Sequence, residues 1–221
     1  MLNIEKFLLL TVPHRSQLSA VEPLFVKART ALALLEFERS KTVTFVPADA
    51  TKTWDYENPL IKVDETSTPT APGLNGAFKK ISKFHDKRVS AALGNKKLDP
   101  AEGLLEEFAR QGILTTKSHD YQLVATDALE SIVDDLGLAL RGQREVTQQD
   151  RILLEVIEAI NATKLLLGSA QPNWSMSQFS EQVHQYPSGN PVVAQLVKDT
   201  SSMTGLMEQS KLVALSKDAA A

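Results

Sequence analysis

Apolar residues recur every three or four positions along most of this chain, and that spacing predicts helices. Strand-like alternation appears at residues 42–46 and 60–63, and again in the runs GILTT and YQLVAT, which the turn-rich KSHD separates. The pattern therefore predicts a mainly α fold, a single-domain helical bundle with small β-hairpins. We expect this domain to span residues 1–216 and residues 217–221 to form a disordered tail. The expected helices cover residues 3–11, 19–37, 74–93 (broken or divided in two), 99–111, 128–140, 147–167, a short segment around Phe179 and Val183, and 190–216.

Residues 99–111 carry the clearest signals for the start and end of a helix. Asp99 can accept hydrogen bonds from the first free amides, Pro100 sits where no amide hydrogen is needed, and Glu102 fits a capping box. Gly112 is suited to a left-handed helix end. The pattern predicts a module in which a helix, a glycine and a β-hairpin follow one another.

Other helix starts show similar chemistry. Asn3 is a suitable cap for the first helix, and Ser19 with Glu22 matches a capping box at the second. Thr147 with Asp150 matches another, and Asn190 followed by Pro191 begins the last helix.

Two apolar helices are expected to form the core. The turns ALALLEF at the end of the second helix are apolar nearly all round. The run RILLEVIEAINATKLLL has the richest apolar content and ends at Gly168, so we expect it to be the most buried helix. The Pro- and Thr-rich stretch Glu65–Gly73 cannot be helical and is expected to connect two elements.

Composition narrows the class of protein. The chain has 221 residues and no cysteine, which excludes disulfides and thiol catalysis. Its net charge of −3 argues against a chain-wide nucleic-acid interface. The run FLLLTV near the start is too short to span a membrane and lacks the flanks of a signal peptide. We expect a cytoplasmic protein.

Charge is distributed unevenly. Acidic residues prevail from Glu102 to Glu158, whereas basic residues dominate the segment before them. Aligned lysines attract anionic lipid, and Phe78, Ile81 and Phe84 could add an apolar face. The alternative is that these three pack inward and the lysines form a solvated surface. The basic residues are Lys79, Lys80, Lys83, Lys87, Arg88, Lys96 and Lys97.

Little in the chain suggests catalysis. Nucleotide-binding glycine motifs, the Gly-x-Ser-x-Gly elbow and zinc motifs are all missing. Asp134 and Asp135 are adjacent and therefore point to different sides of a helix. We expect no enzyme, no metal and no cofactor. The four histidines are scattered, at His14, His85, His119 and His184.

Two further interpretations remain open. A helix followed by a hairpin with Lys117 and His119 at its tip could be a winged-helix DNA-binding unit, although Glu102, Glu106 and Glu107 would repel phosphates. The chain could also be a soluble interaction scaffold, with Met203 and Met207 on an adaptable surface.

The order of several motifs resembles the Golgi phosphoprotein 3 family. LNIEKFLLLTV resembles the opening run of that family, and TALALLEFERSKTVTF resembles its buried helix that leads into a strand. The segment from Leu98 to Asp127 resembles its helix, glycine and hairpin, and RILLEVIEAINATKLLLG resembles its long apolar helix. The resemblance implies a peripheral adaptor on the cytosolic face of a membrane that binds phosphatidylinositol 4-phosphate and cytoplasmic tails of membrane enzymes. It also implies self-association.

The resemblance also points to candidate headgroup-binding residues. In the family a Trp and an Arg near the start of the second helix act with two basic residues before the hairpin. This chain has no Trp between Ala20 and Thr30, Arg29 is the nearest substitute for the Arg, and Leu98 and Ala101 fall where the basic pair would be. Together with the basic segment, the candidates for the lipid headgroup are Lys27, Arg29, Lys79, Lys80 and Lys83.

Overall fold

The computed structural model describes residues 1–16, 18–49, 51–69, 71–117, 120–124, 126–171, 173–185, 187–202 and 209–212. The fold is mainly helical with two small antiparallel sheets, which confirms the class that the apolar pattern predicts. The α-helices are α1 (Asn3–Thr11), α2 (Glu22–Arg39), α3 (Thr53–Glu57), α4 (Asn75–Ile81), α5 (Val89–Leu93), α6 (Ala101–Arg110), α7 (Asp127–Leu140), α8 (Gln148–Ala159), α9 (Thr163–Leu167), α10 (Met176–His184) and α11 (Pro191–Thr200). The short 3₁₀ helices are η1 (Val12–His14), η2 (Leu18–Val21), η3 (Pro72–Leu74), η4 (Ser82–Phe84) and η5 (Lys96–Leu98).

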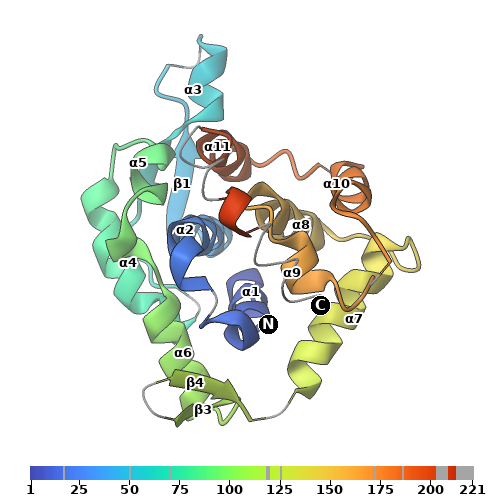
Figure 1. The fold of residues 1–221 in the computed structure, drawn as a ribbon. Helices are drawn as coiled ribbons and strands as arrows, with labels where there is room; N and C mark the ends of the chain where they lie inside the picture. Colours follow the sequence, from blue (N-terminus) through green and yellow to red (C-terminus); the bar gives the residue numbers. More distant parts are fainter. Residues whose placement is uncertain are drawn as a thin grey trace.

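Helix α1 lies in the middle of the molecule, with the other helices arranged around it (Figure 1). It packs against α2, α6, α7 and α8. Seven of its nine residues are buried, compared with seven of twelve in α8. The apolar run after Thr147 does not form one most-buried helix as expected, because it divides into α8 and the short α9, in which four of five residues are buried.

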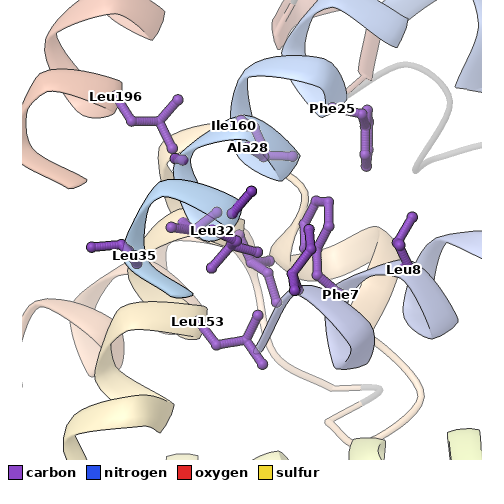
Figure 2. Close-up of a cluster of buried hydrophobic side chains, with 14 of the residues drawn as sticks. Phe7, Leu8, Phe25, Ala28, Leu32, Leu35, Leu153, Ile160 and Leu196 are labelled. Atoms are coloured by element: carbon purple, nitrogen blue, oxygen red, sulfur yellow. The ribbon is translucent and has the colours of Figure 1, made fainter. Parts of the chain in front are cut away.

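The buried hydrophobic side chains form one connected core. Figure 2 shows its centre, where Leu32 and Leu35 of α2 lie near Leu153 of α8 and Phe7 of α1. The rings of Phe7 and Phe25 are tilted by 32° to each other, with centroids 6.0 Å apart. The apolar turns ALALLEF are thus central, as their composition predicts.

Each sheet has two strands. β1 (Val43–Val46) pairs with β2 (Leu60–Val63), with Val43 opposite Val63. β3 (Leu114–Lys117) pairs with β4 (Asp120–Leu123) directly after α6, with Leu114 opposite Leu123. The second sheet packs against η1 and so lies close to the end of α1.

Several end signals act as the sequence predicts. Thr147 and Asp150 form a complete capping box at α8, and Asn190 Oδ1 accepts the Val192 amide at 2.9 Å. Gly112 has a φ of +74°, the left-handed value expected at the end of α6. Asp99 accepts the Ala101 amide at 3.1 Å, but Pro100 is the N-cap of α6 and the predicted capping box with Glu102 does not form.

Other predicted boundaries are wrong. Ser19 does not cap α2, because residues 18–21 form the 3₁₀ turn η2 and the helix begins at Glu22. Asn3 lies inside α1, where its side-chain Nδ2 donates to the backbone carbonyl of Gln149 at 2.7 Å and ties α1 to α8. Between the two strands of the first sheet, where the sequence analysis places no helix, lies the short helix α3, which projects at the top of Figure 1.

The apolar helix expected over residues 147–167 is divided. It ends at Ala159, Asn161 has a φ of +60°, and α9 begins at Thr163. The last predicted helix ends at Thr200, and residues 209–212 form a separate helical turn in which Leu212 is buried. His119, Met203, Met207 and the predicted tail at 217–221 lie outside the described residues.

Candidate anion-binding pocket

An open pocket of about 460 Å³ is lined by residues at the end of α1 and by residues of α4 and α6. Segments far apart in the sequence converge on it, because α1, α2, α4, η5, α6 and β4 all contribute side chains. Aliphatic residues supply part of the wall and charged residues supply most of the rest. The lining residues are Leu8, Thr11, Val12, Arg15, Leu18, Glu22, Arg29, Lys80, Lys96, Asp99, Ala101, Glu102, Leu105 and Tyr121.

Arg29 is the buried cation of this pocket. Its Nε and Nη2 atoms donate to Asp99 at 2.9 and 2.7 Å, and Nη2 also donates to Glu22. Burial alone would lower the pKa of Arg29, but the hydrogen bonds and charges of Asp99 and Glu22 outweigh it and raise that pKa. Arg29 therefore stays charged and its charge is already matched within the protein.

Other cations of the pocket are exposed. Arg15 lies over the ring of Tyr121, with its guanidinium carbon 5.3 Å from the ring centroid. Lys80 and Lys96 reach the pocket from α4 and η5. Neither lysine forms an ion pair with another described residue, so their charge is available to an anion.

The sequence candidates separate in space. Arg29 and Lys80 line the pocket, whereas Lys27, Lys79 and Lys83 do not. Residues 27 and 29 point to nearly opposite sides of α2, because successive helical residues turn by about 100°. Lys79 instead lines a shallow depression beside Phe78 and Val63, and Lys83 is exposed on η4.

Arg15, Lys96 and Tyr121 belong to the pocket although the sequence candidates do not include them. Lys96 lies within the basic segment, so charge counting gives a partial signal for it. Arg15 and Tyr121 come from segments more than 100 positions apart, so no local pattern connects them.

The polar side chains of the pocket are mostly charged groups. Thr11 Oγ1 donates to the Leu8 carbonyl at 2.8 Å and is occupied within its own helix. The described residues contain no cluster of three or more His, Cys, Asp or Glu placed to hold a metal ion. Ammonium and guanidinium groups beside an aliphatic wall favour an anionic ligand that also carries apolar atoms.

A second cavity of about 600 Å³ lies between α8, α10 and α11. Its lining is more apolar, with Val193 and Val197, and it includes the carboxylates of Glu155 and Glu158. Glu155 accepts the Ser188 amide at 2.9 Å and Glu158 accepts the Thr163 hydroxyl at 2.7 Å, so both support neighbouring backbone segments.

Comparisons of the chain with protein-family models, with curated proteins and with solved structures find no match. Within the described ranges, no helix combines the length and the apolar character needed to cross a lipid bilayer.

Proposed function

We propose that this chain is a non-enzymatic adaptor that binds the anionic headgroup of a lipid of the phosphatidylinositol 4-phosphate kind on the cytosolic face of a membrane. The observation that carries the proposal is the convergence of Arg15, Lys80 and Lys96 on one open pocket with a partly aliphatic wall. Lysine and arginine donors form the strongest hydrogen bonds to phosphate oxygens. The pocket also contains Arg29 and Ala101, the positions that the resemblance to the Golgi phosphoprotein 3 family singles out.

Exposed lysines that neighbour the pocket lysines in the sequence support the same proposal. Lys79, Lys83, Lys87 and Lys97 are all exposed. Each basic residue near an anionic membrane contributes about 1 kcal/mol of attraction. This surface would hold the protein against the bilayer while the pocket selects the headgroup. Cytoplasmic tails of membrane enzymes and further copies of the chain are the partners that such an adaptor would assemble.

A winged-helix function has less support. The hairpin β3–β4 does follow α6, as that fold requires. The outer side of α6 however carries the exposed carboxylates Glu102 and Glu106, which would repel a DNA backbone.

Co-sedimentation with vesicles tests the lipid proposal. Three sets at one physiological salt concentration would contain neutral lipid, a generic anionic lipid, or phosphatidylinositol 4-phosphate. We expect the chain to bind the phosphoinositide vesicles most tightly. Lys80→Ala should weaken that binding about fivefold, the equivalent of about 1 kcal/mol.

Lys79→Ala is the matched control, because Lys79 is adjacent, exposed and equally charged but lies outside the pocket. It should affect binding to generic anionic vesicles and leave the preference for the phosphoinositide intact. If Lys80→Ala and Lys79→Ala weaken vesicle binding equally and the protein shows no headgroup preference, the chain binds membranes through its surface charge alone and the pocket has no role. Absence of binding to every vesicle would overturn the membrane function and favour a soluble interaction scaffold.

A further inference from the structure

Two serines in the basic segment stand in nearly the same sequence context. Ser82 ends the run KKIS and Ser90 ends the run KRVS. No other serine or threonine of the sequence has basic residues at both the second and the third position before it. Many protein kinases select such sites, because acidic groups beside their catalytic cleft pair with basic residues that precede the acceptor. The sequence alone does not distinguish the two serines as acceptors, but the structure does.

Ser90 is held by several strong interactions. Its amide donates to Asn58 Oδ1 at 3.1 Å, and its hydroxyl accepts from Asn58 Nδ2 at 2.9 Å. The preceding Arg88 donates to the buried carboxylate of Asp55 at 2.6 Å and to the Asn58 carbonyl at 2.8 Å. A kinase must draw its acceptor out to reach the γ-phosphate in line. At Ser90 that movement would break a buried ion pair and both bonds to Asn58, which is costly.

Ser82 is held much more weakly. It follows the last residue of α4, and its hydroxyl donates to the Lys79 carbonyl at 3.2 Å. The seven residues of α4 and the three of η4 form helices too short to be stable by themselves. Lys79, Lys80 and Lys83 are exposed, and none of them forms an ion pair with another described residue. The acceptor and the basic residues that a kinase reads are therefore accessible without loss of an ion pair.

One cost is common to the two sites. Each serine follows a buried apolar residue, Ile81 at 1% exposure and Val89 at 0%. The difference between the sites thus comes from Asn58 and from the ion pair of Arg88, which only the second site contains.

The apolar side chains of the basic segment face the protein. Phe78 lies edge-on against Phe37 with ring centroids 5.4 Å apart, Ile81 is buried, and Phe84 packs against the core. These side chains are not free to enter a bilayer, so the segment offers a membrane its exposed lysines. Attraction that depends on lysines is cancelled by negative charge added among them.

We propose that Ser82 is a regulatory phosphorylation site, at which a kinase that selects basic residues adds a phosphate that releases the chain from an anionic membrane. This inference rests on the proposed lipid function. In the transfer the Ser82 oxygen bonds to the γ-phosphorus of ATP, the bond from that phosphorus to the β,γ-bridging oxygen breaks, and ADP leaves. The hydroxyl proton passes to the catalytic aspartate of the kinase. The new phosphate carries a charge of about −2 beside three lysines and offsets the attraction of about two of them.

The first experiment locates the phosphate. The full chain is incubated with magnesium, ATP and the catalytic subunit of cyclic AMP-dependent protein kinase, which selects basic residues at these two positions, and the products are mapped by mass spectrometry. Ser82 should be modified at least about tenfold faster than Ser90, because its site opens at a lower free-energy cost. Asn58→Ala removes the side-chain bonds to Ser90 and should speed modification of Ser90 alone.

The second experiment measures membrane release by co-sedimentation. Phosphorylated protein should bind both generic anionic vesicles and phosphatidylinositol 4-phosphate vesicles about thirtyfold more weakly than unmodified protein. Ser82→Asp adds a single charge and should weaken binding about fivefold. Ser82→Ala should bind as the wild type does and lose its response to the kinase, whereas the matched control Ser90→Ala should keep the full response. Thermal unfolding of each variant would establish that the fold is retained.

The outcomes separate this inference from the lipid function. Modification of Ser90 in preference to Ser82, or of neither serine, would overturn the assignment of the site. Modification of Ser82 with unchanged vesicle binding would overturn the switch and leave the lipid function intact. Absence of vesicle binding by unmodified protein would overturn the lipid function and the switch together, and phosphate found at Ser82 would then still establish the modification site.

Discussion

Gly103 of α6 and Gly73 of η3 lie backbone against backbone. A Cβ atom on Gly103 would lie 2.6 Å from the carbonyl oxygen of Gly73, closer than any normal contact. The Pro- and Thr-rich connector is thus pressed directly onto α6, and this contact sets the position of the helix that carries Glu102 and Leu105 into the pocket.

We predict that Gly103→Ala destabilises the protein by about 2 kcal/mol, because the added methyl group must push η3 away. Gly76→Ala is the control: nothing lies within 4 Å of its Cβ position, and alanine favours a helix over glycine by about 1 kcal/mol. Urea unfolding of both variants measures the difference. Equal stability of the two would show that the contact between the glycines is not tight.

The buried pair of Arg29 and Asp99 provides a second prediction. Arg29→Met leaves the Asp99 carboxylate without its principal partner and should cost about 3 kcal/mol, and Asp99→Leu should cost a similar amount. The double variant should recover most of that loss, because no buried charge remains unpaired: Glu22 also loses Arg29, but its side chain is 44% exposed and can be solvated. A double-mutant cycle by chemical denaturation measures the coupling. Strictly additive losses would contradict a direct interaction.

The capping box of α8 links stability to pH. Burial raises the pKa of Asp150, but hydrogen bonds from Arg144 and Thr147 outweigh it, so that its pKa in the folded protein lies below the ordinary value. The lowered pKa of Asp150 stabilises the fold at pH values above about 3.9, which is the pKa of an aspartate in an unfolded chain. This stabilisation is lost as the pH falls below that pKa. Wild-type stability should therefore fall more steeply than that of Asp150→Asn between about pH 4 and pH 2. Parallel curves from acid titration of unfolding would contradict the prediction.

Asn161 occupies the left-handed region between α8 and α9 with a φ of +60°. Asn161→Gly should leave stability unchanged or raise it slightly, whereas Asn161→Ala should cost about 1–2 kcal/mol, since a side chain other than asparagine strains this conformation. Thermal unfolding of the two variants measures the contrast. A stable alanine variant would indicate a continuous helix.

The sequence predicts those features that depend on neighbouring residues. Thr147, Asp150 and Asn190 cap helices because a side chain meets an amide two or three positions away. The break at Asn161 is not visible in the apolar pattern, because α8 buries isoleucine and leucine before it and α9 buries leucine after it. A left-handed asparagine is a far weaker signal than a glycine.

The pocket is only partly predictable for a similar reason. Charge along the chain identifies a basic segment, but it does not distinguish Lys80 from Lys79, which the turn of α4 points in a different direction. Arg29 and Asp99 are 70 positions apart in the sequence. Arg15 and Tyr121, whose side chains are in contact, are more than 100 positions apart. These contacts arise from packing between elements, which periodicity does not encode.

The central position of α1 determines when the core can close during synthesis. Asn3 bonds to Gln149, which emerges from the ribosome 146 residues later. At about 5–20 residues per second, the apolar run of α1 must wait on the order of ten seconds for that partner. We therefore expect the nascent chain to expose this run to chaperones until α8 has been made, and the final shape to form late rather than element by element.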